Sequence, residues 1–129
     1  MSDFVPLDES EEERLRQALF IDLIRLAPEG AELLITQDSW QSIPDLLGQR
    51  LAIEEGMWVV ALTPPTREFL VQQAHSRNFQ TTMVHFYIRH QGRDIVTSYD
   101  CMCGMLLDPT FSDYERIITE YTPLGIIMT

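Results

Sequence analysis

Two cysteines, Cys101 and Cys103, are the residues whose types and spacing most directly suggest chemistry. Thiols at positions i and i+2 of a strand face the same way and could begin a soft-metal site. A zinc site needs two further ligands from His75, His85, His90 or a carboxylate, and no second paired spacing supplies them. Buried free cysteine packs like a small hydrophobic residue. We therefore expect structural thiols, with no metal and no cofactor.

Other catalytic patterns are weaker still. A cysteine nucleophile would need a nearby base such as His85, and this stays an alternative. No pair of carboxylates and no Ser-His-Asp set stands at a recognisable spacing, and no phosphate-binding loop or nucleic-acid motif stands out. We therefore name no catalytic residue and expect a protein that is not an enzyme.

Net charge is the strongest functional signal. The 129 residues include 20 carboxylates and nine basic residues, which gives a net charge of −11, and all nine basic residues are arginine. This charge disfavours contact with nucleic acid or anionic lipid and favours fast encounter with a basic protein. Arginine-biased codon usage explains the missing lysine. Escape from lysine-directed tagging, or selection for the planar, always-charged arginine fork, is the functional alternative.

The candidate partner-binding residues form three groups. One is an acidic run at a helix start, and the second is an acid pair before a glycine. The third is the polar face of a strand, where aromatic and arginine side chains are typical of interface hot spots, with an acid on the neighbouring strand. These residues are Glu11, Glu12, Glu13, Glu54, Glu55, His85, Tyr87, Arg89 and Asp100.

Localisation follows from what the chain lacks. Its N-terminus has neither the basic start nor the apolar core of a signal peptide, and no run approaches the ~18 apolar residues of a membrane span. The two cysteines are too close for an ordinary unstrained disulfide, which suits a reducing compartment. We expect a cytoplasmic protein with an acidic flexible arm over residues 1–8 and one globular domain over 9–129.

Helices are the first elements that must position these residues. Leucine spacing predicts an amphipathic helix over 10–27, opened by a capping box of Ser10 and Glu13 and ended by Pro28. A second helix is predicted over 65–77, after a pair of prolines.

Strands are predicted from apolar runs and from alternation. The runs over 31–36 and 57–62 are typical of buried strands. Alternation over 82–90 and 93–100, on either side of the turn at 91–92, predicts a hairpin.

Two further segments leave more room for interpretation. Over 42–56 a helix starting near Pro44 competes with a strand near 50–54. Residues 101–108 are expected to extend the second strand of the hairpin, with Gly104 marking a bulge or a close approach.

The C-terminal part is predicted to hold a last helix and a docked tail. The helix is expected over 111–121 with Ser112 as its N-cap, and the tail over 122–129 is apolar enough to dock as a strand.

These elements give the order α-β-α-β-α-β-β-α and an α/β class, with α+β as the alternative. We expect a single mixed sheet of about four strands with helices packed on it and an antiparallel hairpin near its C-terminal end. Short crossovers predict parallel pairing among the first three strands.

In outline, the succession after the first helix is similar to a thioredoxin-like domain. The redox pair that this family carries after its first strand is absent, because residues 36–39 are Thr-Gln-Asp-Ser. No proline directly precedes the third strand, where residues 80–82 are Gln-Thr-Thr. The resemblance therefore implies no redox function.

The leading hypothesis is a small acidic bacterial binding protein that neutralises a basic protein partner, as an immunity protein does for a toxin. Occlusion would be its mechanism, with carboxylates pairing with the cations that a nuclease toxin uses for phosphate. A secretion chaperone for an effector is the first alternative. A thiol-dependent or thioredoxin-like enzyme that uses Cys101 or Cys103 is the second. The sequence leaves open whether the protein is a monomer or a homodimer.

Overall fold

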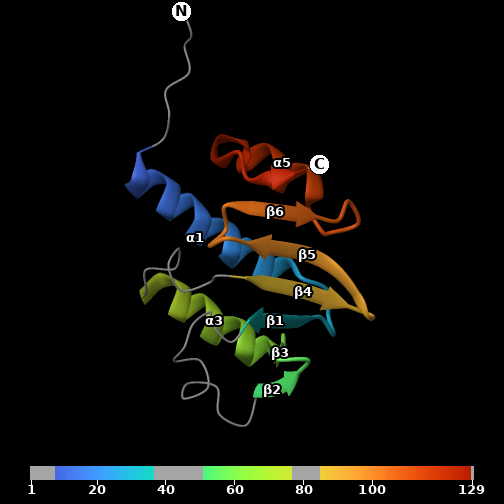
Figure 1. Ribbon diagram of the computed structural model, residues 1–129. Coiled ribbons are helices and arrows are strands. Elements are labelled where there is room, and N and C mark those ends of the chain that lie inside the picture. Colours follow the sequence, from blue (N-terminus) through green and yellow to red (C-terminus); the bar gives the residue numbers. More distant parts are fainter. Residues whose placement is uncertain (1–7, 37–50, 77–84, 129) are drawn as a thin grey trace, which may run out of the picture.

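The computed structural model describes residues 8–36, 51–76 and 85–128, which form one seven-stranded sheet with helices packed on it (Figure 1). The helices are α1 (Glu9–Leu26), α3 (Pro64–Ser76), α5 (Tyr114–Glu120) and the short 3-10 helix η2 (Thr122–Leu124). The strands are β1 (Glu32–Thr36), β2 (Leu51–Glu54), β3 (Met57–Ala61), β4 (Phe86–His90), β5 (Arg93–Tyr99), β6 (Gly104–Leu107) and β7 (Ile127–Met128). The predicted α/β class and single mixed sheet are confirmed, with more strands than expected.

The strand order is β2-β3-β1-β4-β5-β6-β7, and β1 lies antiparallel to both of its neighbours. The predicted parallel pairing of the first three strands is therefore wrong. β2 and β3 form a hairpin through Glu55 and Gly56, both with positive φ, and β3 starts at the end of the sheet where β1 finishes. β3 and β4 flank β1 and run parallel to each other, so the connection through α3 crosses over β1. The antiparallel pairing of β1 with β3 does not match the thioredoxin-like outline, which assumed parallel pairing. Among the described strands only β6 and β7 pair in parallel.

The N-cap of helix α1 lies two residues earlier in the chain than the sequence pattern indicates. A side-chain oxygen of Asp8 accepts a hydrogen bond from the Glu11 backbone N–H at 2.8 Å. Asp8 is therefore the N-cap, and the predicted Ser10–Glu13 capping box is wrong. An acid at the N-cap satisfies a free backbone donor and suits the positive end of the helix dipole. The predicted end is confirmed, because the helix stops at Leu26, just before Pro28.

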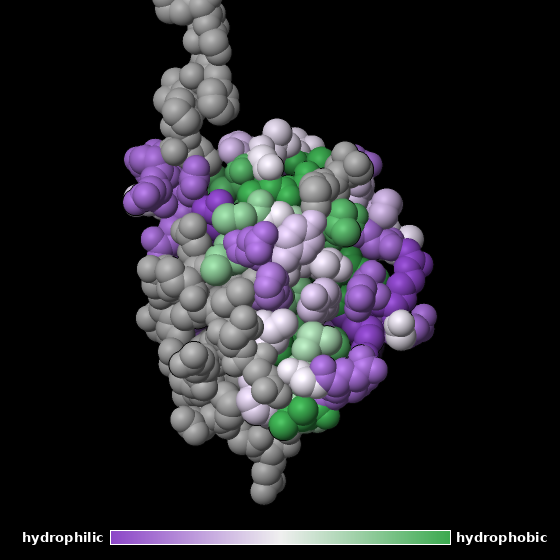
Figure 2. Space-filling model, in the orientation of Figure 1, coloured by the Kyte–Doolittle hydropathy of each residue, from purple (hydrophilic) through white to green (hydrophobic). Residues whose placement is uncertain are grey.

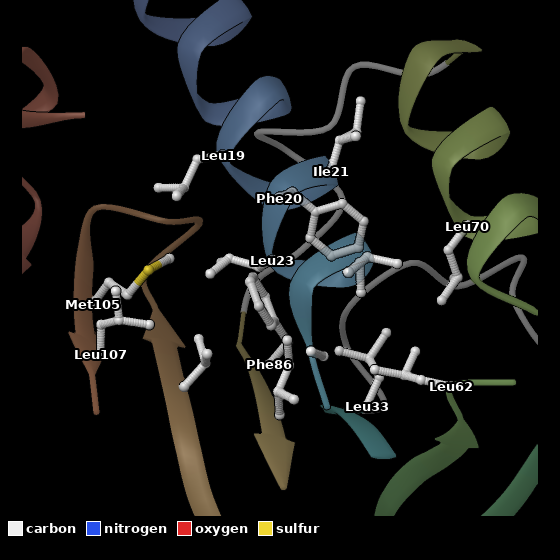
Figure 3. Close-up of a cluster of buried hydrophobic side chains, with 14 of the residues drawn as sticks. Leu19, Phe20, Ile21, Leu23, Leu33, Leu62, Leu70, Phe86, Met105 and Leu107 are labelled. Atoms are coloured by element: carbon white, nitrogen blue, oxygen red, sulfur yellow. The ribbon is translucent and has the colours of Figure 1, made fainter. Parts of the chain in front are cut away.

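The core lies between one face of the sheet and helices α1 and α3, as Figure 3 shows. Phe20 of α1 and Phe86 of β4 are both fully buried, and their rings meet edge to face with centroids 5.4 Å apart. Leu33 of β1 and Leu70 of α3 belong to the same cluster. The core thus connects α1 with the centre of the sheet and fixes where the helix lies.

Several predicted strands are confirmed to within a residue of their bounds. β1 and β3 occupy the two apolar runs, and the β4–β5 hairpin turns at Gln91 and Gly92, both with positive φ. Over 51–54 the chain forms the strand that was the alternative to a helix, and Glu55 and Gly56 form a turn. Residues 42–50 of the predicted helix and residues 82–84 of the predicted hairpin lie outside the described residues.

After β5 the chain reverses instead of extending the strand. Asp100, Cys101 and Met102 all adopt positive φ, and β6 then runs back antiparallel to β5. The predicted extension is wrong because three left-handed residues cannot continue a strand. The close approach at Gly104 is confirmed: a Cβ there would lie 2.5 Å from the Tyr99 ring. Any side chain at this position would displace that ring.

The C-terminal elements lie at the β6 side of the sheet (Figure 1). Helix α5 begins at Tyr114 with Asp113 at the N-cap position in the left-handed region, so the prediction of Ser112 as N-cap is wrong. The docked tail is confirmed by β7, which pairs with β6. The Tyr121 hydroxyl donates to Asp22 of α1, which ties the end of α5 to that helix.

Replacing Tyr121 with phenylalanine is expected to lower the free energy of unfolding by about 2 kcal/mol at neutral pH, because a hydrogen bond to a carboxylate is lost. Tyr121 is buried, and burial together with Asp22 raises its pKa above the ordinary value of 10. A raised pKa stabilises the fold fully below pH 10, and this contribution is lost as the pH rises toward the folded-state pKa. Urea unfolding between pH 7 and 11 should show a smaller alkaline loss in the variant. An equal alkaline loss in both proteins would contradict the assignment.

None of the helices in the described segments combines the length and the apolar character that a membrane span needs.

Candidate protein-binding surface

Most arginines in the described residues are engaged within the fold. Arg16, Arg89, Arg93 and Arg116 form ion pairs with carboxylates, and Arg67 donates to backbone carbonyls. Those ion pairs involve Glu12, Asp22, Glu32, Glu54, Asp108, Asp113 and Glu120. The described carboxylates outside these pairs are Asp8, Glu9, Glu11, Glu13, Glu29, Glu55, Glu68, Asp94, Asp100 and Glu115. The surplus negative charge is therefore not spread evenly, and part of it collects at one place.

That place is the start of α1, where Asp8, Glu9, Glu11 and Glu13 have no ion pair among the described residues. The β5–β6 turn lies against the same helix, because the Nε of the buried Arg16 donates to the Met102 carbonyl at 3.2 Å. Asp100 is exposed in that turn. We call this group, Asp8, Glu9, Glu11, Glu13 and Asp100, the acidic surface. Figure 2 shows hydrophilic side chains over the start of α1.

Glu12, a predicted partner-binding residue, has a structural contact instead of a free carboxylate. It pairs with Arg16 at 3.3 Å, one helical turn away, and the Arg16 side chain is only 7% exposed. Because Arg16 also binds the β5–β6 turn, Glu12 helps to orient the cation that joins the two parts of the acidic surface. Glu11 and Glu13 are left without such a partner among the described residues.

Glu54 and Arg89 lie together in a different group. The Arg89 guanidinium contacts Glu32 and Glu54, each at 3.0 Å, on the sheet face opposite the helices. Hydrogen bonding to Arg89 lowers the pKa of Glu54, and the two carboxylates raise the pKa of Arg89. Arg89 is shared by two carboxylates, so the group keeps a net charge of −1, and both Glu54 and Arg89 are engaged in ion pairs within the fold. Glu55, in the adjacent turn, is exposed.

The predicted recognition strand is therefore divided between two places. His85 lies next to the acidic surface, since its Nδ1 accepts a hydrogen bond from the Asp100 backbone N–H at 3.4 Å. Tyr87 is half-buried on the sheet face opposite helices α1 and α3, where it pairs with Leu34 on one side and Thr97 on the other. Arg89 belongs to the ion-pair group on that same face.

Cys101 and Cys103 lie in the β5–β6 turn rather than on a strand, so their i and i+2 spacing does not make them face the same way. Cys101 is half-buried and Cys103 is exposed, and no disulfide joins the two. Across the described segments, no three side chains of the His, Cys, Asp or Glu types come together as a group that could hold a metal ion.

Sequence reasoning missed Asp8 and Glu9, which it placed in or beside the arm, and Arg16, which organises the surface. The Asp8-x-x-Glu11 spacing is itself a helix-start signal and could have identified Asp8. No sequence signal identifies Arg16, because its partner Met102 is 86 residues away along the chain.

No protein-family model, curated protein or solved structure matches this chain.

Proposed function

We propose that this protein is a small binding protein without a catalytic role, which docks through the acidic surface onto a protein with a basic surface. An immunity or inhibitor protein for a bacterial toxin is the form that we favour. The observation that supports this most is the distribution of charge: most of the described arginines are engaged inside the fold, while carboxylates with no ion pair among the described residues gather at the start of α1.

Several features of the acidic surface suit electrostatic docking. Most of its carboxylates stand on the first turns of a helix whose inner face is buried. The backbone there is already ordered, so binding costs little further conformational entropy. Clustered charge of one sign raises the rate of encounter with an oppositely charged partner, and salt weakens this effect. A nuclease uses basic side chains to bind the phosphate groups of its substrate. Carboxylates that pair with those side chains would inhibit the nuclease by occlusion.

Replacing Glu9, Glu11 and Glu13 together with lysine is expected to slow association with a basic partner by on the order of 100-fold at low salt. Affinity capture from the source lysate supplies the partner, and stopped-flow or biosensor kinetics at two salt concentrations supplies the rate. A glutamine version of the same variant separates loss of attraction from repulsion. Asp8 is left unchanged so that the helix keeps its N-cap.

The matched control reverses Glu29, Glu68 and Glu115, three exposed carboxylates that lie on other elements and have no ion pair among the described residues. It changes the net charge by the same amount. The proposal expects the control to bind nearly as fast as the wild type. Equal loss in both variants would mean that total charge matters and the acidic surface does not; unchanged binding in both would exclude electrostatic docking.

A further inference from the structure

Two described arginines differ from the others, whose side chains form ion pairs or hydrogen bonds within the fold. In the described part of the chain, Arg14 and Arg25 form neither an ion pair nor a side-chain hydrogen bond, and both are exposed. They stand 11 residues apart, which is close to three full helical turns, so both project from the same side of α1. In a chain with a net charge of −11, the two arginines left without such contacts in the described segments thus share one helix face.

That face forms the floor of a groove of about 380 Å³ between α3 and α5. Between the two arginines, α1 contributes the apolar Ala18 and the nearly buried Ile21, together with the polar Gln17 and Asp22. The walls include His75, Glu120 and Tyr121. The groove thus has apolar side chains in its middle and one arginine toward each end.

The two carboxylates in the same groove contact Arg116 rather than Arg14 or Arg25. Asp22 accepts from the Tyr121 hydroxyl and lies 3.6 Å from Arg116, while Glu120 pairs with Arg116 at 2.5 Å. Both acids are thus engaged with residues of α5. Arg14 and Arg25 remain available to an outside group.

We propose that this groove docks an amphipathic helix of a partner protein, with apolar residues in its middle and carboxylates about three turns apart. Arg14 and Arg25 are separated by roughly 16 Å along the axis, at 1.5 Å per residue, which is too far for one small anion. A second helix repeats the same rise, so its acids can reach both cations while its apolar face meets Ala18 and Ile21.

A second copy of this chain fits the groove poorly. Two-fold pairing of α1 with itself places Arg14 against Arg25 of the copy when the helices are antiparallel, and like residues against like when they are parallel. Either arrangement brings cations together. This proposal does not depend on the acidic surface. The groove is proposed to bind a helix that carries carboxylates, whereas the acidic surface is proposed to bind a basic protein.

Two synthetic amphipathic peptides test the proposal, identical except for glutamate or lysine at two positions three turns apart. Fluorescence anisotropy at physiological salt, where long-range repulsion from the net charge is screened, measures their affinity for the full chain. The glutamate peptide is expected to bind roughly tenfold more tightly than the lysine peptide and to shift the amide resonances of Ala18 and Ile21. Absence of binding by the glutamate peptide, or equal binding of the two, would overturn the proposal.

The variant with Arg14→Gln and Arg25→Gln should lose roughly tenfold in affinity for the glutamate peptide. The control with Ala52→Glu and Ser112→Glu has the same net charge, with both changes at exposed positions on other elements, and should bind normally. An equal loss of affinity in the control would contradict binding in the groove. A concentration-dependent dimer of the chain that the double arginine variant abolishes would also contradict the proposal, because the occupant would then be a second copy. The variants that replace Glu9, Glu11 and Glu13 should not weaken binding of the glutamate peptide. The two proposals can therefore fail separately.

Discussion

Replacing Arg67 with methionine is expected to lower the free energy of unfolding by about 3 kcal/mol. The guanidinium donates from Nη1 to the carbonyls of Ile24 at 2.9 Å and Ala27 at 2.6 Å, and from Nη2 to that of Pro28 at 2.9 Å. Its Nε donates to the Leu62 carbonyl at 2.8 Å. The last carbonyls of a helix have no partner within the helix, so one side chain here satisfies the end of α1 and joins it to α3.

Part of this contribution offsets the desolvation of a half-buried cation. Burial lowers the pKa of Arg67, yet a guanidinium remains charged in proteins, so the carbonyls must compensate for the lost hydration. Methionine fills similar space but leaves the carbonyls without donors. Urea unfolding measures the effect. A loss below about 0.5 kcal/mol would show that water replaces the guanidinium at these carbonyls.

The lysine variant at the same position separates shape from charge. An ammonium group donates from one nitrogen and cannot span four carbonyls as the planar fork does, so Arg67→Lys should recover only part of the stability. This gives one position at which arginine has a structural reason beyond codon usage. Full recovery with lysine would remove that reason.

The local elements could be predicted because their signals are local. The leucine spacing of α1, the apolar run of β3 and the Gln91-Gly92 turn each lie within a few residues of the structure they determine. The direction of β1 could not be predicted in this way. Parallel and antiparallel neighbours require the same buried residues, and only the hairpin of β2 with β3 decides which end of β3 meets β1.

The candidate site was visible in the sequence only as a run of acids. Which of the acids are engaged depends on distant contacts: Arg16 binds Met102, and Arg89 lies between Glu32 and Glu54. Those contacts divide residues that one strand pattern had placed together. Arg14 and Arg25 likewise stand out only by comparison with the partners that the other described arginines have, and not through any motif.

Replacing Phe20 with alanine is expected to have the largest effect of any single change, a loss of about 3–5 kcal/mol in the free energy of unfolding. Phe20 is fully buried, and its ring meets that of Phe86 edge to face between α1 and β4 (Figure 3). A small domain is stable by only about 5–15 kcal/mol, so this variant should be close to unfolding at moderate temperature. Thermal and urea denaturation measure the loss.

The matched variant, Phe20→Leu, keeps most of the apolar volume and should cost less than half as much. A double-mutant cycle with Phe86→Leu should give a coupling of about 0.5–1.5 kcal/mol, the contribution expected for an aromatic pair beyond its buried area. Zero coupling would show that the two rings act only as separate apolar volumes. Helix α1 carries both the acidic surface and the groove, and this pair holds it to the sheet. The leucine variants, if folded, should therefore loosen both binding surfaces together, whereas the charge variants change one surface at a time.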